Sequence, residues 1–354
     1  MPSDLGSTSS PHVKEPEREK LGIVERLLQG EITALVGAAR DANGTHYLRM
    51  LDQRGLSADL IGSQYIGRYP FELLQNANDS AAKASDSGAS SSKSVLFTLT
   101  DKALLVADMG AGFGDEEVDA ICNLGRTSKD PRKTIGYKGL GFKSVAQITD
   151  TPQIISSPHR FQFDAARAQD LVSTKLGPFP TDQRIPIYAF PFPLTPSDLG
   201  PDCVLVDECL SKGYRTILRL PFKAGVSRSS VEKDIGSLLS PQILLLLGAV
   251  DELILCGVSK PLRVQRARDE QNGILRVLLE IQISGSNSLE DWLLFEKTVE
   301  IPDRRLVARL GDNWSRVSSV RIAIAVPLRD NRPYCGRMHP LHVYFPTEET
   351  RGRP

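Results

Sequence analysis

Residues 103–121 read ALLVADMGAGFGDEEVDAI, and this stretch decides the expected fold. A run of apolar residues, 103–107, leads into the carboxylate Asp108, which is typical of a buried strand with a polar end. Glycines directly after Asp108 give the backbone dihedral freedom for a sharp turn. Apolar periodicity then resumes as a helix with Asp115 as its cap. The sequence therefore predicts a strand, a glycine turn and a helix in direct succession.

The segments upstream predict a hairpin partner and a second helix. Residues 95–100 form another strand-like run, and the Asp101-Lys102 connection joins the two runs as a β-hairpin. Before them, PFELLQNANDSAAKA begins at Pro70, where proline fits the first turn of a helix. A Ser- and Gly-rich loop, DSGASSSKS, separates this helix from the hairpin.

Three polar residues of that helix define a candidate site. Glu72, Asn76 and Asp79 are spaced i, i+4 and i+7, so their side chains project from one face. Two carboxylates and an amide supply oxygen ligands for Mg²⁺ and a base for a water nucleophile. A solvated helix face is the alternative explanation when the segment is considered alone.

A second glycine run, GYKGLGF at 136–142, opens another helix. Free backbone N–H groups at a helix N-terminus favour anions, so the run predicts a phosphate-binding loop. It follows a long basic loop rather than a leading βαβ unit and lacks GxxxxGK[ST], which excludes the Rossmann and P-loop readings. Lys138 and Lys143 flank the run, either as phosphate contacts or as exposed lysines.

The remaining chain predicts further strands at 153–156, 160–163, 187–189 and 215–220, and then a helix at 231–247. Strand-like stretches follow at 253–255, 274–283, 292–301, 320–326 and 341–345, and early helices are expected from Leu21 and over about 48–60. Residues 1–20 are polar and predicted to be disordered. We expect domains at 21–225 and 226–354.

Composition constrains the class of protein. Lys+Arg and Asp+Glu both number 43 among 354 residues, a balance that argues against a nucleic-acid partner. Five scattered cysteines without a CxxC pair predict reduced thiols inside a cell rather than a disulfide framework, and Cys203 with Cys209 makes only a weak metal pair. No apolar run is long enough for a signal peptide or a membrane span, so a soluble intracellular protein without a membrane partner is expected.

The three polar and glycine segments, in this order, resemble the boxes of the GHKL superfamily of gyrase B, heat-shock chaperones, histidine kinases and MutL. ELLQNANDS (72–80) looks like the N-box, DMGAGF (108–113) like the adenine box and GYKGLGF (136–142) like the phosphate box. The amino-acid sequences of these segments are most similar to those of the sacsin and No Vein branch. The resemblance implies an α+β protein: a Bergerat-fold two-layer α/β sandwich, with a mixed sheet and helices on one face, followed by a smaller α+β domain.

The resemblance also implies a role for each matched position. Glu72 would be the catalytic general base, Asn76 would hold Mg²⁺ and contact ATP, and Asp79 would support the nucleotide pocket. Asp108 would accept a hydrogen bond from the adenine amino group. The other ATP-binding positions implied are Met109, Gly110, Gly112, Phe113, Asn123, Lys129, Gly136, Gly139, Leu140, Gly141, Phe142 and Thr216. Asn123 and Lys129 would belong to a lid over residues 113–135, and Arg215 stands where the family has glycine before the threonine.

The implied activity is Mg²⁺-dependent binding of ATP with slow hydrolysis, in which lid closure is coupled to the region 226–354, as in a chaperone-like machine. An interaction or scaffold module that binds nucleotide without turnover remains the alternative. A histidine kinase lacks support because no histidine-bearing dimerisation helix precedes the N-box. A protein client or self-association is implied as partner. The chain ends at PTEETRGRP, where relatives continue, which predicts a truncated product.

Overall fold

The structure, a computed structural model, describes the chain in segments. They are residues 21–40, 44–64, 67–86, 93–123, 141–178, 183–238, 240–271, 274–301, 305, 318–334, 342–343 and 345–346. The predictions made for residues 1–20, Lys129 and the glycine run up to Leu140 lie outside these segments.

One twelve-stranded sheet runs through the described chain, in the order β12-β11-β10-β9-β8-β7-β1-β2-β6-β3-β4-β5. Its strands are β1 (Ser94–Leu99), β2 (Ala103–Asp108), β3 (Gln153–Ser156), β4 (His159–Phe163), β5 (Pro191–Pro193), β6 (Thr216–Pro221), β7 (Glu252–Cys256), β8 (Leu262–Gln271), β9 (Ile274–Ile283), β10 (Ser286–Glu300), β11 (Ser319–Arg329) and β12 (Arg332–Pro333). Among these strands β1 and β7 pair in parallel, and the other neighbours pair antiparallel. A separate two-stranded sheet joins β13 (His342–Val343) to β14 (Phe345–Pro346). The predicted mixed sheet in an α+β protein is confirmed.

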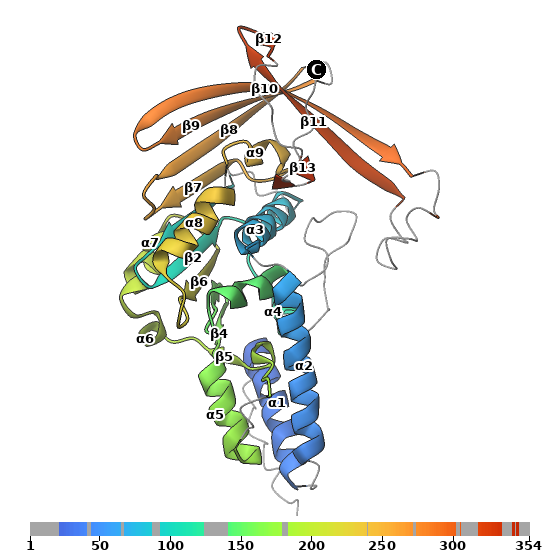
Figure 1. Ribbon diagram of the computed structural model, residues 1–354, viewed down its shortest axis with the longest axis vertical. Helices are drawn as coiled ribbons and strands as arrows, with labels where there is room; N and C mark the ends of the chain where they lie inside the picture. The colour runs from blue at the N-terminus through green and yellow to red at the C-terminus, as the bar shows by residue number, and fades with distance from the viewer. Residues whose placement is uncertain are drawn as a thin grey trace, which may run out of the picture.

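The helices occupy one end of the molecule and its middle (Figure 1). They are α1 (Ile23–Arg40), α2 (Gly44–Gln64), α3 (Tyr69–Asp86), α4 (Asp115–Cys122), α5 (Ala165–Leu176), α6 (Pro196–Leu199), α7 (Cys203–Ser211), α8 (Arg228–Leu238) and α9 (Ile243–Leu246), with 3₁₀ helices η1 (Gly141–Gln147), η2 (Ile187–Ala189) and η3 (Gly200–Asp202). Helices α1, α2 and α5 gather at the end opposite to β8–β11, and α3 lies between these two groups. The helix that carries the candidate polar face is thus central.

Strand β2 is buried along its whole length because helices cover both faces of the sheet here. Leu104 and Val106 join the main core, to which α3 contributes Leu74 and Ala77. The residues between them pack on the opposite face against α7, where Val206 is fully buried. Helices on one face only were expected, so α7 is a difference. Successive side chains of a strand point to opposite faces of the sheet, so the side chains of β2 pack alternately on one face and on the other.

Several predicted elements need correction. The expected strand at 187–189 is the 3₁₀ helix η2, because Pro186 and Pro191 bracket it and remove ladder donors. The expected helix at 231–247 breaks at Pro241 into α8 and α9, since proline disfavours a helical residue before it. Helix α4 begins at Asp115 itself, and its preceding Gly114 N–H donates to the Glu117 carboxylate at 2.9 Å. Asp115 is therefore not the cap.

The sheet continues past the expected domain boundary at residue 225. Strand β7 pairs with β1, with Leu253 opposite Val95 and Cys256 opposite Thr98. The strands after residue 225 therefore extend the same sheet that contains the β1–β2 hairpin. The division into two domains stays a prediction.

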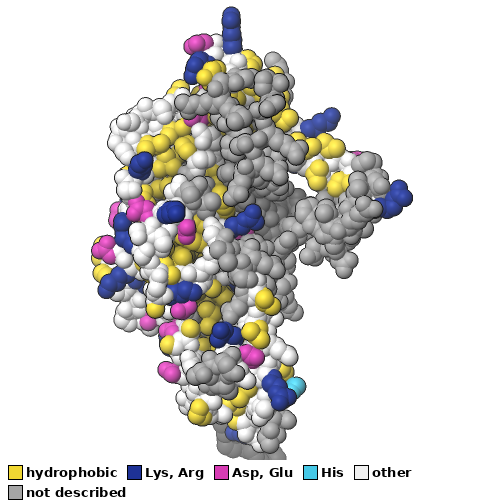
Figure 2. Space-filling view, in the orientation of Figure 1, with side chains coloured by type: hydrophobic (Ala, Val, Ile, Leu, Met, Phe, Trp, Pro, Cys, Tyr) yellow, Lys and Arg dark blue, Asp and Glu magenta, His cyan; other side chains and the backbone are white. Residues whose placement is uncertain are grey.

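Surface and sulphur chemistry of the described residues agree with an ordinary globular protein. Lys, Arg, Asp and Glu side chains are intermingled on the face shown in Figure 2. The four cysteines of the described segments, Cys122, Cys203, Cys209 and Cys256, carry free thiols. Within the same segments, no helix has the length and hydropathy needed to cross a bilayer, and no three His, Cys, Asp or Glu side chains group as metal ligands.

The β1–β7 junction gives a test of the fold. Gly257 follows β7 at φ +67°, and a Cβ there would lie 2.1 Å from the Leu99 carbonyl oxygen of β1. We expect Gly257→Ala to lower the free energy of unfolding by about 2–4 kcal/mol, through strain and steric clash. Gly236→Ala in α8, where no heavy atom lies within 4 Å, is the matched control and should stabilise by about 0.5–1 kcal/mol. Equal effects of the two substitutions in urea unfolding would contradict the junction.

Candidate functional site

Asp108 lies at the end of β2, where the sheet meets the glycine turn. Its side chain is buried, with 8% of its surface exposed. In the β2–β6 ladder Asp108 stands opposite Thr216, and its carbonyl oxygen accepts from Arg215 N at 2.8 Å. The carboxylate oxygen Oδ1 accepts from Gly110 N at 2.9 Å. The turn therefore folds back onto the carboxylate that precedes it.

Hydroxyl groups from three further elements surround this carboxylate. Ser80 of α3 and Thr216 of β6 both donate side-chain hydrogen bonds to Asp108. The hydroxyl of Thr216 lies 3.3 Å from that of Ser156 in β3, and Ser156 in turn accepts from Phe113 N at 2.8 Å. We call Ser80, Asp108, Ser156 and Thr216 the carboxylate–hydroxyl cluster. It joins α3, β2, β3, β6 and the glycine turn at one point.

Burial changes the acidity of Asp108. Desolvation disfavours the charged form and raises the pKa of Asp108 to about 6, although hydrogen bonds from Gly110, Ser80 and Thr216 each act to lower it. Desolvation is the larger effect. The carboxylate would therefore gain from one more donor, and an amino group of a ligand could provide it.

Two positions of the glycine turn, Gly110 and Gly112, favour a residue without a side chain. A Cβ at Gly110 would lie 2.1 Å from the Ser80 hydroxyl and 2.6 Å from its carbonyl carbon, so the turn approaches helix α3 closely. Gly112 has φ +81°, a conformation that favours glycine. Main-chain bonds complete the fit: Ala111 N donates to Ser80 O at 3.0 Å and Met109 N to Ser94 O at 3.2 Å. Helix α3 and strand β1 thus clamp the turn from two sides.

The polar triad of α3 occupies the helix that this turn contacts. Glu72, Asn76 and Asp79 all lie within α3, as the spacing predicted. Asp79 is buried with 7% exposed, whereas Glu72 and Asn76 are partly exposed. Asp79 directly precedes Ser80, so the end of the triad adjoins the carboxylate–hydroxyl cluster. The structure thus brings the end of the segment that resembles the N-box, at Ser80, against the turn that resembles the adenine box.

The phosphate side is described only in part. Gly141 and Phe142 begin the 3₁₀ helix η1, whereas Lys129, Gly136, Gly139 and Leu140 lie outside the described segments. The Phe142 ring is buried and meets Tyr188 edge-on, with ring centroids 6.1 Å apart. The Asn123 side chain donates to Asp119 O at 2.8 Å, closing the end of α4. Their predicted roles toward phosphate stay predictions.

The side chain of Lys143 is buried, whereas an exposed lysine was one of the two alternatives for it. Its side chain is 1% exposed, and Nζ donates to the Ile121 carbonyl oxygen at 3.2 Å while lying 4.7 Å from the centroid of the Tyr188 ring. Desolvation lowers its pKa to about 8. Lys143 therefore connects η1 to the C-terminal turn of α4 and is not a surface lysine, whereas its contact with phosphate stays a prediction.

Two residues of the cluster were missed. Ser80 stands inside the quoted NANDS segment, where only Asp79 was assigned a role. Ser156 ends a short strand and carries no local signal, because its place beside Thr216 depends on strand pairing across 60 residues. Thr216 was assigned in spite of Arg215, and the structure puts its hydroxyl on Asp108.

Comparison with known proteins finds two similarities. The family described as Sacsin domain matches residues 61–236, a range that holds α3, the glycine turn and β6. This part of the chain is sacsin-like. Protein NO VEIN of Arabidopsis thaliana is 28% identical over 235 residues, which cover 64% of this chain and 8% of that protein. The chain thus spans less than a tenth of the relative's length, and the two similarities support the sacsin/No Vein branch.

The raised pKa of Asp108 predicts a pH dependence of stability. Because its pKa is raised from 3.8 to about 6, the Asp108 carboxyl makes its full contribution to the free energy of unfolding below about pH 4. This contribution is lost as the pH rises through 6. The loss is about 3 kcal/mol. Asp108→Asn removes this ionisation. Between pH 4 and 7, the free energy of unfolding of the unmodified chain should therefore fall by about 3 kcal/mol relative to that of the variant.

Denaturant unfolding at a series of pH values measures the difference. Asp101→Asn is the matched control, because the Asp101 side chain is 99% exposed. A difference between Asp108→Asn and the unmodified chain that does not vary with pH would show that burial leaves the Asp108 carboxyl unchanged.

Proposed function

We propose that the chain binds Mg²⁺–ATP, with adenine at the carboxylate–hydroxyl cluster, and hydrolyses it slowly. The observation that carries the proposal is Asp108: a desolvated carboxylate at a strand end, beside a turn whose Gly110 packs closely against Ser80 of α3. An adenine amino group is the type of donor that such a carboxylate accepts.

The residues of α3 fit the metal and the water. Asn76 carries an amide oxygen and Glu72 a carboxylate, one helical turn apart and both partly exposed. Hard oxygen atoms suit Mg²⁺, which would bridge the phosphates and neutralise their charge. Asn76 would hold the ion, and Glu72 would orient a water molecule and accept its proton as the water attacks the γ-phosphate in line.

Two features support the proposal from outside the cluster. The order of the three boxes along the chain resembles that of the GHKL superfamily, and the Sacsin domain match covers all of them. The proposed lid, residues 113–135, and the chaperone-like coupling to a protein client or to a second copy rest on that resemblance alone.

Base recognition gives the first test. Asp108 distinguishes a 6-amino from a 6-oxo purine, because a carbonyl oxygen opposite a carboxylate offers no donor. We expect ATP to bind about 10- to 100-fold more tightly than ITP, which carries a 6-oxo group in place of the 6-amino group and a proton on the neighbouring N1. Titration calorimetry with Mg²⁺ present measures both affinities, and Asp108→Asn should narrow the gap.

The same titration depends on pH. Donation from adenine favours the ionised carboxylate, so ATP affinity should fall as the pH drops below about 6 and Asp108 becomes protonated. Equal affinity for ATP and ITP in the unmodified chain would refute adenine recognition by Asp108.

Turnover gives the second test. We expect Glu72→Ala to reduce phosphate release by about 10²–10⁴-fold, because the general base is lost, while the ATP dissociation constant changes little. Glu25→Ala on the exposed side of α1, outside the proposed lid, is the matched control and should leave both quantities unchanged. Phosphate release and thermal shift with ATP separate the two effects.

If the unmodified chain binds ATP and releases no phosphate, a nucleotide-dependent interaction module replaces the ATPase. If Glu72→Ala turns over like the unmodified chain, another group activates the water.

A further inference from the structure

Helix α3 is held by the chain that follows β6, in addition to its own packing. At its first turn, the Tyr69 hydroxyl donates to the Asp234 carboxylate of α8 at 3.2 Å. Further along, the Asn78 carboxamide oxygen accepts from Ala249 N at 2.9 Å. Asn78 is 5% exposed, so this second contact is a buried one. The position of α3 therefore depends on where the segment carrying Ala249 lies.

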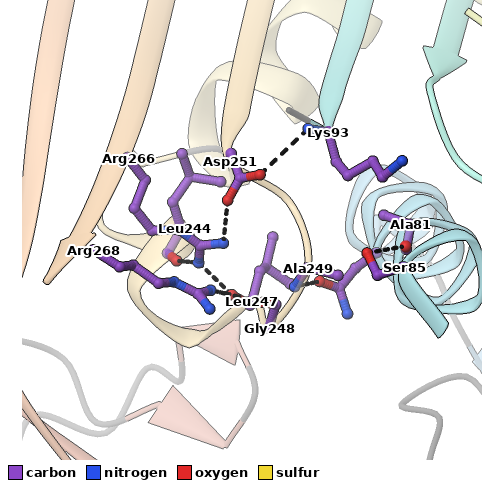
Figure 3. Close-up of polar contacts among 11 residues, drawn as sticks. Ala81, Ser85, Lys93, Leu244, Leu247, Gly248, Ala249, Asp251, Arg266 and Arg268 are labelled. Atoms are coloured by element: carbon purple, nitrogen blue, oxygen red, sulfur yellow. Dashed lines mark hydrogen bonds and ion pairs between the residues drawn. The ribbon is translucent and has the colours of Figure 1, made fainter. Parts of the chain in front are cut away.

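Two arginines of β8 donate hydrogen bonds to that segment, residues 247–251 between α9 and β7 (Figure 3). Arg268 donates to the carbonyl oxygens of Leu247 at 2.9 Å and Gly248 at 2.7 Å. Arg266 also donates to the Leu247 carbonyl oxygen and to that of Leu244. Both side chains extend from the strand toward the same turn. We call residues 247–251 the α9–β7 turn.

The contacts of Arg266 continue to strand β1. Its side chain is fully buried and forms an ion pair with Asp251 at 3.2 Å. The other oxygen of the Asp251 carboxylate accepts from Lys93 N at 3.3 Å, immediately before β1. The α9–β7 turn is thus fixed to β8, to the start of β1 and, through Ala249, to α3.

Stability alone does not explain this use of a buried arginine. Within the described segments, Arg266 Nε is buried without a hydrogen-bond partner. Such a donor costs about 1–3 kcal/mol, and well-packed apolar residues often replace buried ion pairs without loss of stability. A guanidinium that bridges carbonyl oxygens in a fixed fork does specify where those carbonyls lie. The arrangement is suited to positioning the turn.

We propose that Arg266 and Arg268 are positioning residues for helix α3, so that a shift of strands β8–β11 changes the geometry of Glu72 and Asn76. The contact path runs from the two arginines through Leu247 and Gly248 to Ala249 and Asn78. This inference rests on the proposed function for its effect on ATP, but its mechanical part concerns only α3.

Arg268 offers the cleaner variant, because it is exposed at the edge of the contact, whereas loss of the buried Arg266 endangers folding. The set comprises Arg268→Gln, Arg268→Lys, Asn78→Ala and the double variant with Arg268→Gln. Arg263→Gln is the matched control: Arg263 lies on the same strand, is exposed and pairs with Glu252 at 2.7 Å instead of with the turn.

Amide hydrogen exchange of residues 70–80 tests the mechanical part without nucleotide. We expect exchange to quicken by about 3- to 30-fold in Arg268→Gln and Asn78→Ala, with partial rescue in Arg268→Lys and no change in Arg263→Gln. The double variant should exchange no faster than the more affected single variant, because both substitutions interrupt one path.

Kinetics test the effect on the site. Arg268→Gln should lower the rate of phosphate release by about 3- to 30-fold and change the ATP dissociation constant by less than about 2-fold, a split that general destabilisation would not give. Unchanged exchange in α3, or purely additive effects in the double variant, would overturn the inference. If ATP fails to bind the unmodified chain while Arg268→Gln still quickens exchange in α3, the proposed function fails and the positioning of α3 stands.

Discussion

The structure depends on one buried carboxylate and the donors that hold it. Asp108 ends the central hairpin in a dry environment, where a charged group is costly unless it is hydrogen-bonded. The bonds from Gly110, Ser80 and Thr216 come from the turn, from α3 and from β6, so satisfying the carboxylate fixes these three elements relative to each other. The close approach of Gly110 to Ser80 leaves no room for a side chain. A ligand that donates a hydrogen bond to Asp108 would therefore meet a carboxylate whose neighbouring elements are fixed relative to each other.

Helix α3, which carries Ser80, is also held by hydrogen bonds to the chain after β6. Asn78 and Tyr69 connect α3 to the segment after β6, and the parallel pairing of β1 with β7 joins the two halves of the sheet. The proposed coupling between α3 and strands β8–β11 would follow this short series of hydrogen bonds.

The local parts of this arrangement could be predicted from the sequence. The hairpin, helix α3 with Glu72, Asn76 and Asp79 on one face, and the glycine turn after Asp108 all follow from periodicity and glycine placement over fewer than about twenty residues. The non-local parts could not. Ser156 reaches the cluster only through the β3–β6 register, and Arg266 lies on a strand with several charged side chains, in which no local signal marks the buried one. Burial also reversed the expectation for Lys143, since no local pattern reveals an interior lysine.

The most direct measurement of the central claim is the carboxyl titration of Asp108, observed by carbon NMR in a chain labelled at aspartate, with and without Mg²⁺–ATP. The account predicts a pKa of about 6 for Asp108 in the free chain, falling below that value when ATP binds, because the adenine amino group stabilises the charged form. An Asp108 pKa that is the same in the free and the ATP-saturated chain would contradict adenine recognition at this carboxylate, whatever else the nucleotide contacts.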